Sequence, residues 1–306
     1  MLYHKGMNIR KTRLVIAGQY ARIYMCIGMV FLCLLNLSGT AAAGSPKAVP
    51  ADIAQTTPGL SPHKALYDIT MTSRKSSGQI VNIGGQMLYE WYPGCEAWVT
   101  NHRFNLLYEY TDHPPMRIAS NFTTYETYDG TSLNFSSQRK RNGRLFQELR
   151  GKATRDKQTG EGVAVNSMPD GMRFELPRGT LFPMAHTIKL LEKVHSGQRI
   201  FNSTIFDGSD EDGPIEISAF IGREQPYRTR LKKVTPQIDQ TLLEKPARNI
   251  RLAFFPLEND SEDAEYEMDI MFHDNGVISD MVVEYRLFSV RQTLVALEKT
   301  IPETCD

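Results

Sequence analysis

The sequence predicts a mainly β protein, an antiparallel sheet with a single helix, and three observations support this class. Apolar and polar residues alternate over many short stretches, as they do in strands with one buried face. Asp-Gly and Asn-Gly pairs, which favour hairpin turns, separate several of these stretches. Helical periodicity between the strands, which a parallel sheet would need, is almost absent. The pattern is therefore typical of a meander in which consecutive strands pair.

The strands expected before the helix follow this alternation closely. In the first of them, Tyr67, Ile69 and Met71 alternate with polar residues. The second is interrupted by Gly84 and Gly85, which indicate a bulge or a bend. The expected ranges are 66–72, 79–92, 96–110, 116–128, 133–141, 145–154 and 172–176.

One segment has the properties of a helix. Pro183 suits a first helical turn, and Gly197 stands just past the expected last residue. Ile188, Leu191 and His195 have the spacing of one helical face. One helix among many strands is expected to pack on the sheet or plug it.

The alternating pattern resumes after the helix. Its last part, residues 289–300, is ambiguous: Val290, Leu294 and Leu297 have helical spacing, but the strand alternation also continues. The other expected strands lie at 199–206, 215–221, 229–234, 250–255, 265–272 and 277–288.

The first 43 residues are predicted to be a signal peptide, cleaved after Ala43. Five basic residues and no acidic one precede an apolar run from Ile23 to Leu37, which small residues follow. This run is shorter than the roughly 20 apolar residues that span a bilayer; an uncleaved anchor is the alternative. Residues 44–62 form a Pro-rich lead-in, and we expect residues 63–306 to form one β domain.

The charge balance changes when the predicted signal peptide is removed. The whole chain has 35 basic and 35 acidic residues, and loss of the leader makes it mildly acidic. It has no basic tract, so nucleic acid is not an expected partner.

Only Cys95 and Cys305 remain after cleavage, and an oxidising compartment favours a disulfide between them. Closing so long a loop would stabilise the fold by about 5 kcal/mol at most. The alternative is a nucleophilic Cys95. The nearest histidine, His102, lies seven positions on, and an odd offset along a strand would place it on the opposite face.

An acidic loop at residues 207–213 is the best metal candidate. Aligned with an EF-hand, Asp210 and Asp212 take positions three and five. Positions one and twelve, however, fall on Gly208 and Ala219, which carry no carboxylate. A solvated turn is the favoured interpretation.

Glu192 and His195 could also share a metal, but no second helix is expected to supply further ligands. The chain has no H-E-x-x-H, G-x-S-x-G, C-x-x-C or Gly-rich phosphate motif. We therefore expect no metal, no cofactor and no enzymatic activity.

Aromatic residues gather in the first half of the chain. Most are expected to fill a core, but a curved sheet lined with them could form a trough for a lipid tail or an apolar peptide. The residues are Tyr89, Trp91, Trp98, Phe104, Tyr108, Tyr110, Phe122, Tyr125 and Tyr128.

Several short motifs together resemble one known family. They are Ala65-Leu66-Tyr67, Gly85-Gln86-Met87, Glu90-Trp91, Cys95-Glu96-Ala97-Trp98, Asn121-Phe122-Thr123-Thr124-Tyr125-Glu126, Asp129-Gly130, Leu181-Phe182-Pro183 and the near-terminal Cys305. Over residues 61–306 the chain resembles the EipB-like family of periplasmic cell-envelope integrity proteins of alphaproteobacteria.

The resemblance implies about fourteen antiparallel strands wound into an open, oval, barrel-like spiral. It also implies a disulfide between Cys95 and Cys305, a role in envelope integrity under stress, and a functional link to periplasmic proteins with TPR repeats. We therefore expect a non-enzymatic periplasmic scaffold or binding protein that acts with protein partners. A carrier of lipid or lipoprotein is the alternative, and a hydrolase of envelope polymers is a more distant one.

Overall fold

The computed structural model describes residues 59–75, 79–225, 237–257, 263–301 and 305. The predicted signal peptide, most of the predicted lead-in and the expected strand at 229–234 lie outside these residues. Within the described chain, no helix has both the length and the apolar character needed to cross a bilayer.

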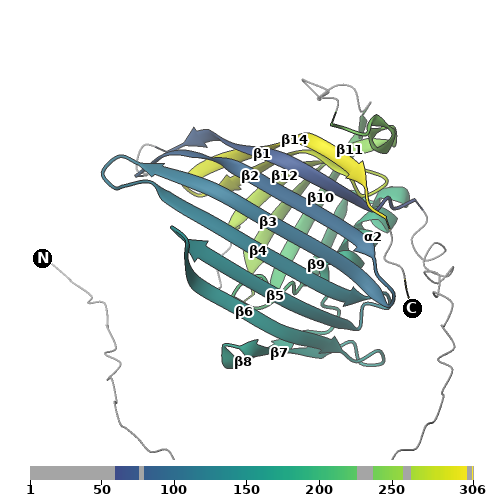
Figure 1. Cartoon of the computed structure of the whole chain (residues 1–306). Helices are drawn as coiled ribbons and strands as arrows, with labels where there is room; N and C mark the ends of the chain where they lie inside the picture. The colour runs from purple at the N-terminus through teal and green to yellow at the C-terminus, as the bar shows by residue number, and fades with distance from the viewer. Residues whose placement is uncertain (1–58, 76–78, 226–236, 258–262, 302–304, 306) are drawn as a thin grey trace, which may run out of the picture. The chain divides into compact units, whose positions relative to one another are not determined.

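Fourteen strands of the described chain form one antiparallel sheet (Figure 1), which confirms the predicted fold class and strand number. The strands are β1 (His63–Arg74), β2 (Ile80–Pro93), β3 (Ala97–Tyr110), β4 (Met116–Thr127), β5 (Ser132–Arg141), β6 (Arg144–Arg155), β7 (Gly162–Met168), β8 (Asp170–Leu176), β9 (Ile200–Ile205), β10 (Ile215–Gln225), β11 (Ala247–Pro256), β12 (Tyr266–His273), β13 (Ile278–Tyr285) and β14 (Phe288–Lys299). The helical elements are α2 (Pro183–His195) and a short 3-10 helix, η2 (Gln240–Leu243).

The first and last strands are neighbours in the middle of the sheet. Pairing runs from β8 back to β1, crosses to β14 and continues to β9. The β1–β14 pairs include Leu66 opposite Ala296 and Asp68 opposite Thr293. The sheet therefore has two arms, one from each half of the chain, and its outer edges are β8 and β9.

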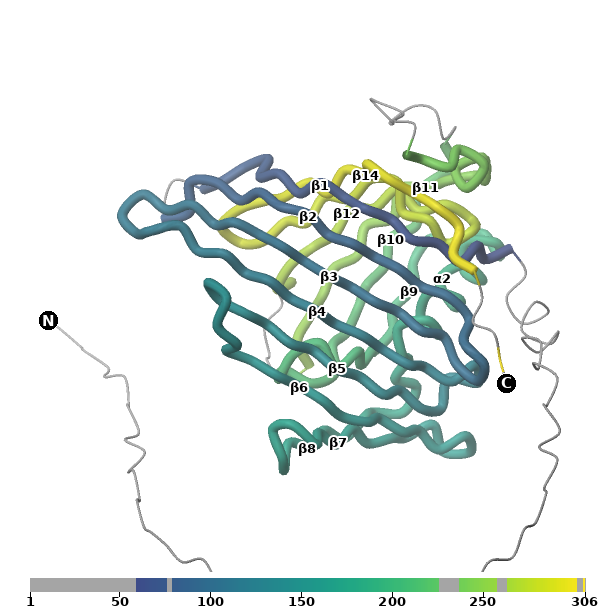
Figure 2. Tube along the Cα trace, viewed as in Figure 1, coloured from purple at the N-terminus to yellow at the C-terminus, as the bar shows by residue number. Residues whose placement is uncertain are grey.

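These two edges approach each other because the sheet curls (Figure 2). Between β8 and α2 the chain crosses from one edge to the other. There the Leu181 amide donates to the Thr204 carbonyl at 2.8 Å, and the Phe206 amide donates to the Leu181 carbonyl at 3.0 Å. This short parallel bridge gives a barrel-like closure at one point of the seam.

Helix α2 begins without a capping side chain of its own. Its N-cap residue, Phe182, makes no side-chain cap hydrogen bond. Instead the buried carboxylate of Glu126, on β4, accepts the amides of Met184 and Ala185 at 2.7 and 2.8 Å. A carboxylate at this position satisfies exposed amides and complements the helix dipole. One side chain of the sheet thereby positions the helix.

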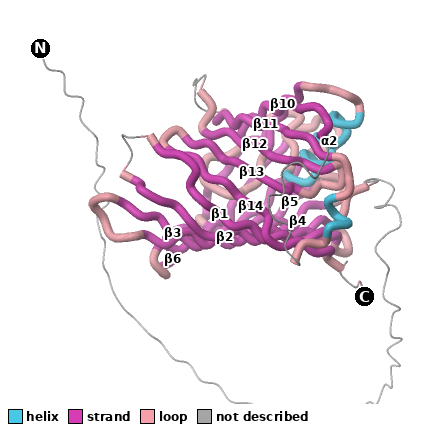
Figure 3. The backbone as a smooth tube through the Cα atoms, turned by 90° about the horizontal axis from the view of Figure 1, so that it is seen from above, coloured by secondary structure: helices cyan, strands magenta, loops and turns pink. Residues whose placement is uncertain are grey.

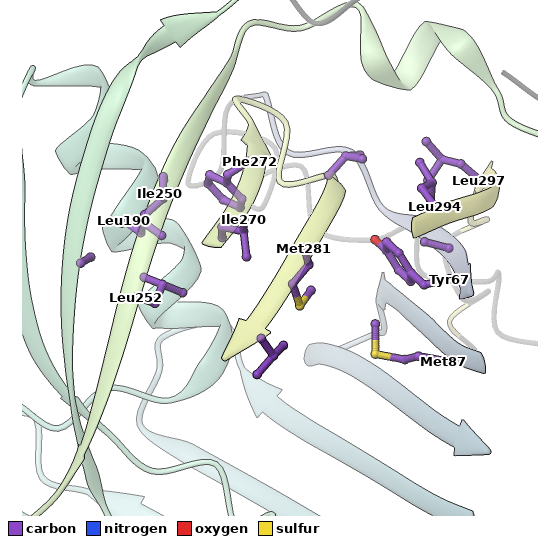
Figure 4. Packing of buried hydrophobic residues seen from close by; sticks show 14 of the residues in the cluster. Tyr67, Met87, Leu190, Ile250, Leu252, Ile270, Phe272, Met281, Leu294 and Leu297 are labelled. Carbon is purple, nitrogen blue, oxygen red and sulfur yellow. The ribbon is translucent and has the colours of Figure 1, made fainter. Parts of the chain in front are cut away.

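The main apolar core lies between α2 and the sheet. Leu190, Leu191 and Val194 of the helix belong to it, together with residues of both arms. Figure 4 shows Leu190 near Ile250 on β11, within the same cluster. Of the side chains predicted to share one helical face, Leu191 is buried in this core, whereas His195 is exposed in the last turn of the helix.

The segment at residues 289–300, for which helix and strand were both left open, belongs to a strand, β14, because tertiary pairing with β1 and β13 on both sides outweighs the helical spacing. Strand β7 was not predicted; it is a short run whose apolar residues Val163 and Val165 are partly or largely exposed.

Candidate functional site

Inward-facing side chains are buried at one end of the strands and only partly buried at the other. On β3, Trp98 and Thr100 are buried, whereas Phe104, Leu106 and Tyr108 are only half-buried. Strands β1, β4, β12 and β14 show the same gradient. The buried ends lie beside α2, which occupies one end of the strands in Figure 3. We call this the helix end and the opposite one the far end.

Half-buried apolar side chains from five strands share the inner face at the far end, and we call them the far-end lining. They are Met71, Ile80, Phe104, Leu106, Tyr108, Tyr266, Met268 and Phe288. Each packs against the main core and keeps part of its surface exposed. Because most apolar side chains of a stable core are fully covered, this partly exposed group is a candidate binding surface.

Tyrosines of both arms meet at the far end. Burial raises the pKa of the Tyr285 hydroxyl to about 12, and the neighbouring Tyr108 adds to the rise. Burial likewise raises the pKa of Tyr108 and Tyr266. Since β3 and β13 are four strands apart in the sheet order, curling brings Tyr108 and Tyr285 together. All three hydroxyls stay neutral at physiological pH and can donate hydrogen bonds.

The acidic loop packs against the sheet, so the predicted solvated turn is wrong for part of it. Gly208 is buried, and a Cβ atom at that position would lie 2.3 Å from the Phe135 ring. The Arg139 guanidinium donates to the Ser209 carbonyl at 3.0 Å. Glu211, by contrast, is exposed.

Two carboxylates of this loop lie close to the far-end lining. Burial raises the pKa of Asp207, and it raises that of Asp210 to about 6. Both carboxylates contribute to the raised pKa of Tyr266, and Arg139 partly offsets their own shifts. The loop therefore brings negative charge, partly balanced by Arg139, to one side of the apolar surface.

The metal candidates face other partners. Glu192 pairs with Lys189 at 2.7 Å, and the imidazole of His195 lies 3.7 Å from the Asp274 carboxylate. Across the residues that the structure describes, no three His, Cys, Asp or Glu side chains converge on a point that could hold a metal.

A disulfide joins Cys95 to Cys305 at the helix end. The sulfur atoms are 2.03 Å apart and the Cα atoms 5.5 Å apart. Cys95 lies in the turn before β3 and Cys305 follows β14, so the bond ties the end of the chain to the first arm. Close by, the Thr300 hydroxyl donates to the Trp91 carbonyl at 2.9 Å. In this oxidised form Cys95 has no thiol with which to act as a nucleophile.

The aromatic residues that the sequence singled out divide between the two ends. Four form or border a buried cluster with Met184 of α2: Tyr89, Trp91, Trp98 and Tyr128. Two belong to the far-end lining: Phe104 and Tyr108. The other three are half-buried elsewhere: Tyr110, Phe122 and Tyr125. Core filling thus applies to the aromatic cluster at the helix end, whereas Phe104 and Tyr108 belong to the partly exposed lining at the far end.

Sequence reasoning missed the second arm's share of the lining. Tyr266, Met268 and Phe288 lie in or beside expected strands, but nothing in the alternation shows that they meet Phe104 and Tyr108. Knowledge of the β1–β14 pairing is needed to bring the two arms onto one inner face.

The structure also contains two surface hollows outside the far-end lining. A groove of about 730 Å³ beside β9 and β10 is lined by polar side chains such as Asn202, Thr204 and Ser218. A smaller hollow of about 270 Å³ beside α2 is lined in part by Trp98 and Arg155. The lining of the larger groove also includes the apolar residues Phe255, Pro256 and Leu257.

Comparison with known proteins gives consistent results. The sequence matches the family model described as EipB-like over residues 54–300. A relative in Brucella abortus (strain 2308), named cell envelope integrity protein EipB, is 28% identical over 243 residues, which cover 78% of this chain and 84% of that protein. A Brucella abortus crystal structure, described as a β-barrel-like protein of a domain of unknown function, is similar with a TM-score of 0.71 and 26% identity, over 79% of this chain and 99% of that chain.

Proposed function

This chain belongs to the EipB-like family, and on that premise we propose that it supports the integrity of the cell envelope as a non-enzymatic binding protein of the periplasm. The name of the Brucella relative supports the envelope role. The predicted signal peptide and the disulfide support an oxidising, exported location.

The observation that carries the binding role is the far-end lining. Its apolar side chains remain partly exposed, whereas the inner face at the helix end is covered by α2 and the tryptophan cluster. A monomeric protein gains stability by covering such surface, so its retention supports use in recognition. We propose as partner a periplasmic protein with TPR repeats, whose stacked helices form concave binding surfaces.

A matched pair of variants tests this role. Leu106→Glu places a charge in the far-end lining, and Asn105→Glu places the same charge on the adjacent, exposed residue of the opposite strand face. Cells lacking the protein should become more sensitive to detergents and to antibiotics that act on the cell wall. The wild type and Asn105→Glu should restore resistance, and Leu106→Glu should not.

The partner is identified by capture from envelope extract. Wild type and Asn105→Glu should retain the same TPR-repeat protein, and Leu106→Glu should lose it. Equal capture by all three proteins would contradict a role for the far-end lining in partner binding.

A second candidate function is the carriage of lipid or lipoprotein. It is favoured by one observation: the lining consists of aliphatic and aromatic side chains and methionines, which suit an acyl chain. Mass spectrometry of the purified protein separates the candidates. Copurifying acyl chains that are lost in Leu106→Glu would support the carrier, and a protein free of lipid would support the scaffold.

A further inference from the structure

The hairpin turn between β5 and β6 exposes two neighbouring apolar side chains. Leu145 is 50% exposed and Phe146 is 47% exposed. A β-bulge causes this: Arg139 pairs with Gln147 but Lys140 pairs with Leu145, so β6 has one extra residue here. A bulge interrupts the normal alternation and can re-aim a side chain, which places both apolar residues at the surface.

The turn itself is well defined. Asn142 and Gly143 have φ angles of 50° and 82°, the left-handed geometry of a two-residue hairpin turn. The Asn142 side chain accepts the Arg117 amide at 2.8 Å, and the Asn142 amide donates to the Arg117 carbonyl at 2.9 Å. The neighbouring strand β4 therefore supports the turn.

Basic side chains surround this apolar pair. Lys140, Arg141, Arg144 and Arg117 are all exposed, and the Arg141 guanidinium lies 4.8 Å from the centre of the Phe146 ring. None of the four forms an ion pair with any residue that the structure describes. Their positive charge is thus available to an external anion.

A second turn at the same end repeats the combination. Between β13 and β14, Leu287 is exposed beside Arg286, and the Lys75 amide donates to the Leu287 carbonyl at 2.9 Å. Arg74 and Lys75 add two exposed basic side chains. Both turns lie at the end of the sheet opposite α2 in Figure 2.

The geometry points to the far end as a docking surface for an anionic phospholipid membrane. Leu145 and Phe146 would enter the interfacial region, and the arginines around them would contact headgroup phosphates. A protruding turn with apolar side chains at its tip and basic side chains around them suits a deformable planar surface better than the groove of a protein. Exposed acidic residues are also present at this end. Asp112 and Glu265 lie on other segments. Glu211 borders the β5–β6 turn, where it accepts the Gln147 side-chain amide at 3.1 Å, so the membrane contact is restricted to the apolar pair and the basic side chains on the other side of the turn.

Vesicle flotation tests this inference with the purified, disulfide-bonded protein. Vesicles of phosphatidylethanolamine and phosphatidylglycerol should carry the protein upward, and vesicles of phosphatidylcholine alone should not. Raising the salt concentration should weaken binding, because exposed charges are screened. Binding of equal strength to both vesicle types would overturn the inference.

Two double variants separate the apolar and the electrostatic contributions. Leu145→Ser with Phe146→Ser should weaken binding to the anionic vesicles by at least tenfold. Arg141→Gln with Arg144→Gln should weaken it and reduce its salt dependence. Because all four side chains are exposed, thermal unfolding should stay close to that of the wild type, which excludes misfolding as the cause.

The helix end provides a matched control. Ile200 and Phe220 are paired across β9 and β10, are 63% and 54% exposed, and have Arg199 over the Phe220 ring. Ile200→Ser with Phe220→Ser should leave vesicle binding unchanged. If this control variant lost as much vesicle binding as Leu145→Ser with Phe146→Ser, binding would reflect general apolar adhesion, and the proposal would be wrong.

Membrane docking goes beyond the proposed function and can fail independently of it. Leu106→Glu, which tests the partner surface, should still bind anionic vesicles. If wild-type protein captures an acidic protein through Arg141 and Arg144 but ignores all vesicles, the turn serves a protein partner and the membrane assignment is wrong.

Discussion

The helix end and the far end are made from the same strands, yet they differ in how their inner faces are covered. At the helix end, α2, the tryptophan cluster and the disulfide cover the inner face, and Glu126 links sheet and helix. At the far end, the lining stays partly exposed and the turns carry exposed arginines. The difference indicates that stability resides at one end, which leaves the other free to bind.

Loss of the disulfide should have the largest effect on this division. Cys305→Ser opens a loop of 210 residues, which lowers the free energy of unfolding by up to about 5 kcal/mol. At roughly 2–4 °C per kcal/mol, the melting temperature should fall by up to about 10–20 °C. Circular dichroism of the oxidised protein, with and without reductant, measures this.

Cys95→Ser is the control for that experiment and should match Cys305→Ser. A reduced wild type that melts at the same temperature as the oxidised one would show that the helix end does not depend on its covalent tie.

A pair of truncations compares the two ends directly. Leu243→Ala removes a fully buried side chain of the main core and should cost about 2–5 kcal/mol. Met268→Ala removes a half-buried side chain of the far-end lining, which has less apolar area to lose, and should cost about 1 kcal/mol. Urea unfolding measures both, and equal costs would contradict the division between the ends.

Glu126 gives the helix end a pH dependence of its own. Burial raises the pKa of its carboxyl to about 7, although the amides of Met184 and Ala185 and the charge of Arg155 oppose the shift. Because the folded state binds this proton more tightly than the unfolded state does, Glu126 contributes to the free energy of unfolding. The contribution is fully present below pH 4.5 and is lost as the pH rises through 7. The loss should reach about 3 kcal/mol.

Glu126→Gln isolates that contribution, because it does not titrate and keeps an acceptor for one of the two helix amides. Loss of the second hydrogen bond changes stability by an amount that does not depend on pH. The difference in unfolding free energy between Glu126→Gln and the wild type should grow in favour of the variant from pH 4.5 to 7. A constant difference would mean that Glu126 titrates normally.

The smallest effect on stability is expected at the exposed turn. Leu145→Ser with Phe146→Ser should change the free energy of unfolding by less than about 0.5 kcal/mol, since neither side chain is buried. Differential scanning fluorimetry checks this. A loss of several kcal/mol would show that Leu145 and Phe146 stabilise the fold, as residues of the helix end do, and would contradict the difference between the two ends.

Local patterns were sufficient to predict most strands. The alternation around Tyr67 and the turn at Asn142 and Gly143 depend only on neighbouring residues, and the expected bounds there agree with the structure to within a few residues. Strand β14 was ambiguous because its two neighbours, not its own sequence, make it a strand.

Contacts between distant segments could not be predicted. Glu126 lies 58 residues from the amide of Met184 that it caps, and the alternation of apolar and polar residues does not indicate that the two come together. The same holds for Tyr108 and Tyr285, which approach only after the sheet curls. The residue pattern therefore indicates the strands, and the order in which they pair determines the candidate site.

The central position of the β1–β14 pair has a kinetic consequence. In chain order β1 comes first and its second neighbour, β14, comes last among the fourteen strands. Each arm can form hairpins early from local contacts, but the junction between the arms must wait for β14, and contacts of such long range slow folding. Until then β1 is an unpaired edge that can recruit another chain, so folding intermediates should be prone to aggregation until β14 arrives.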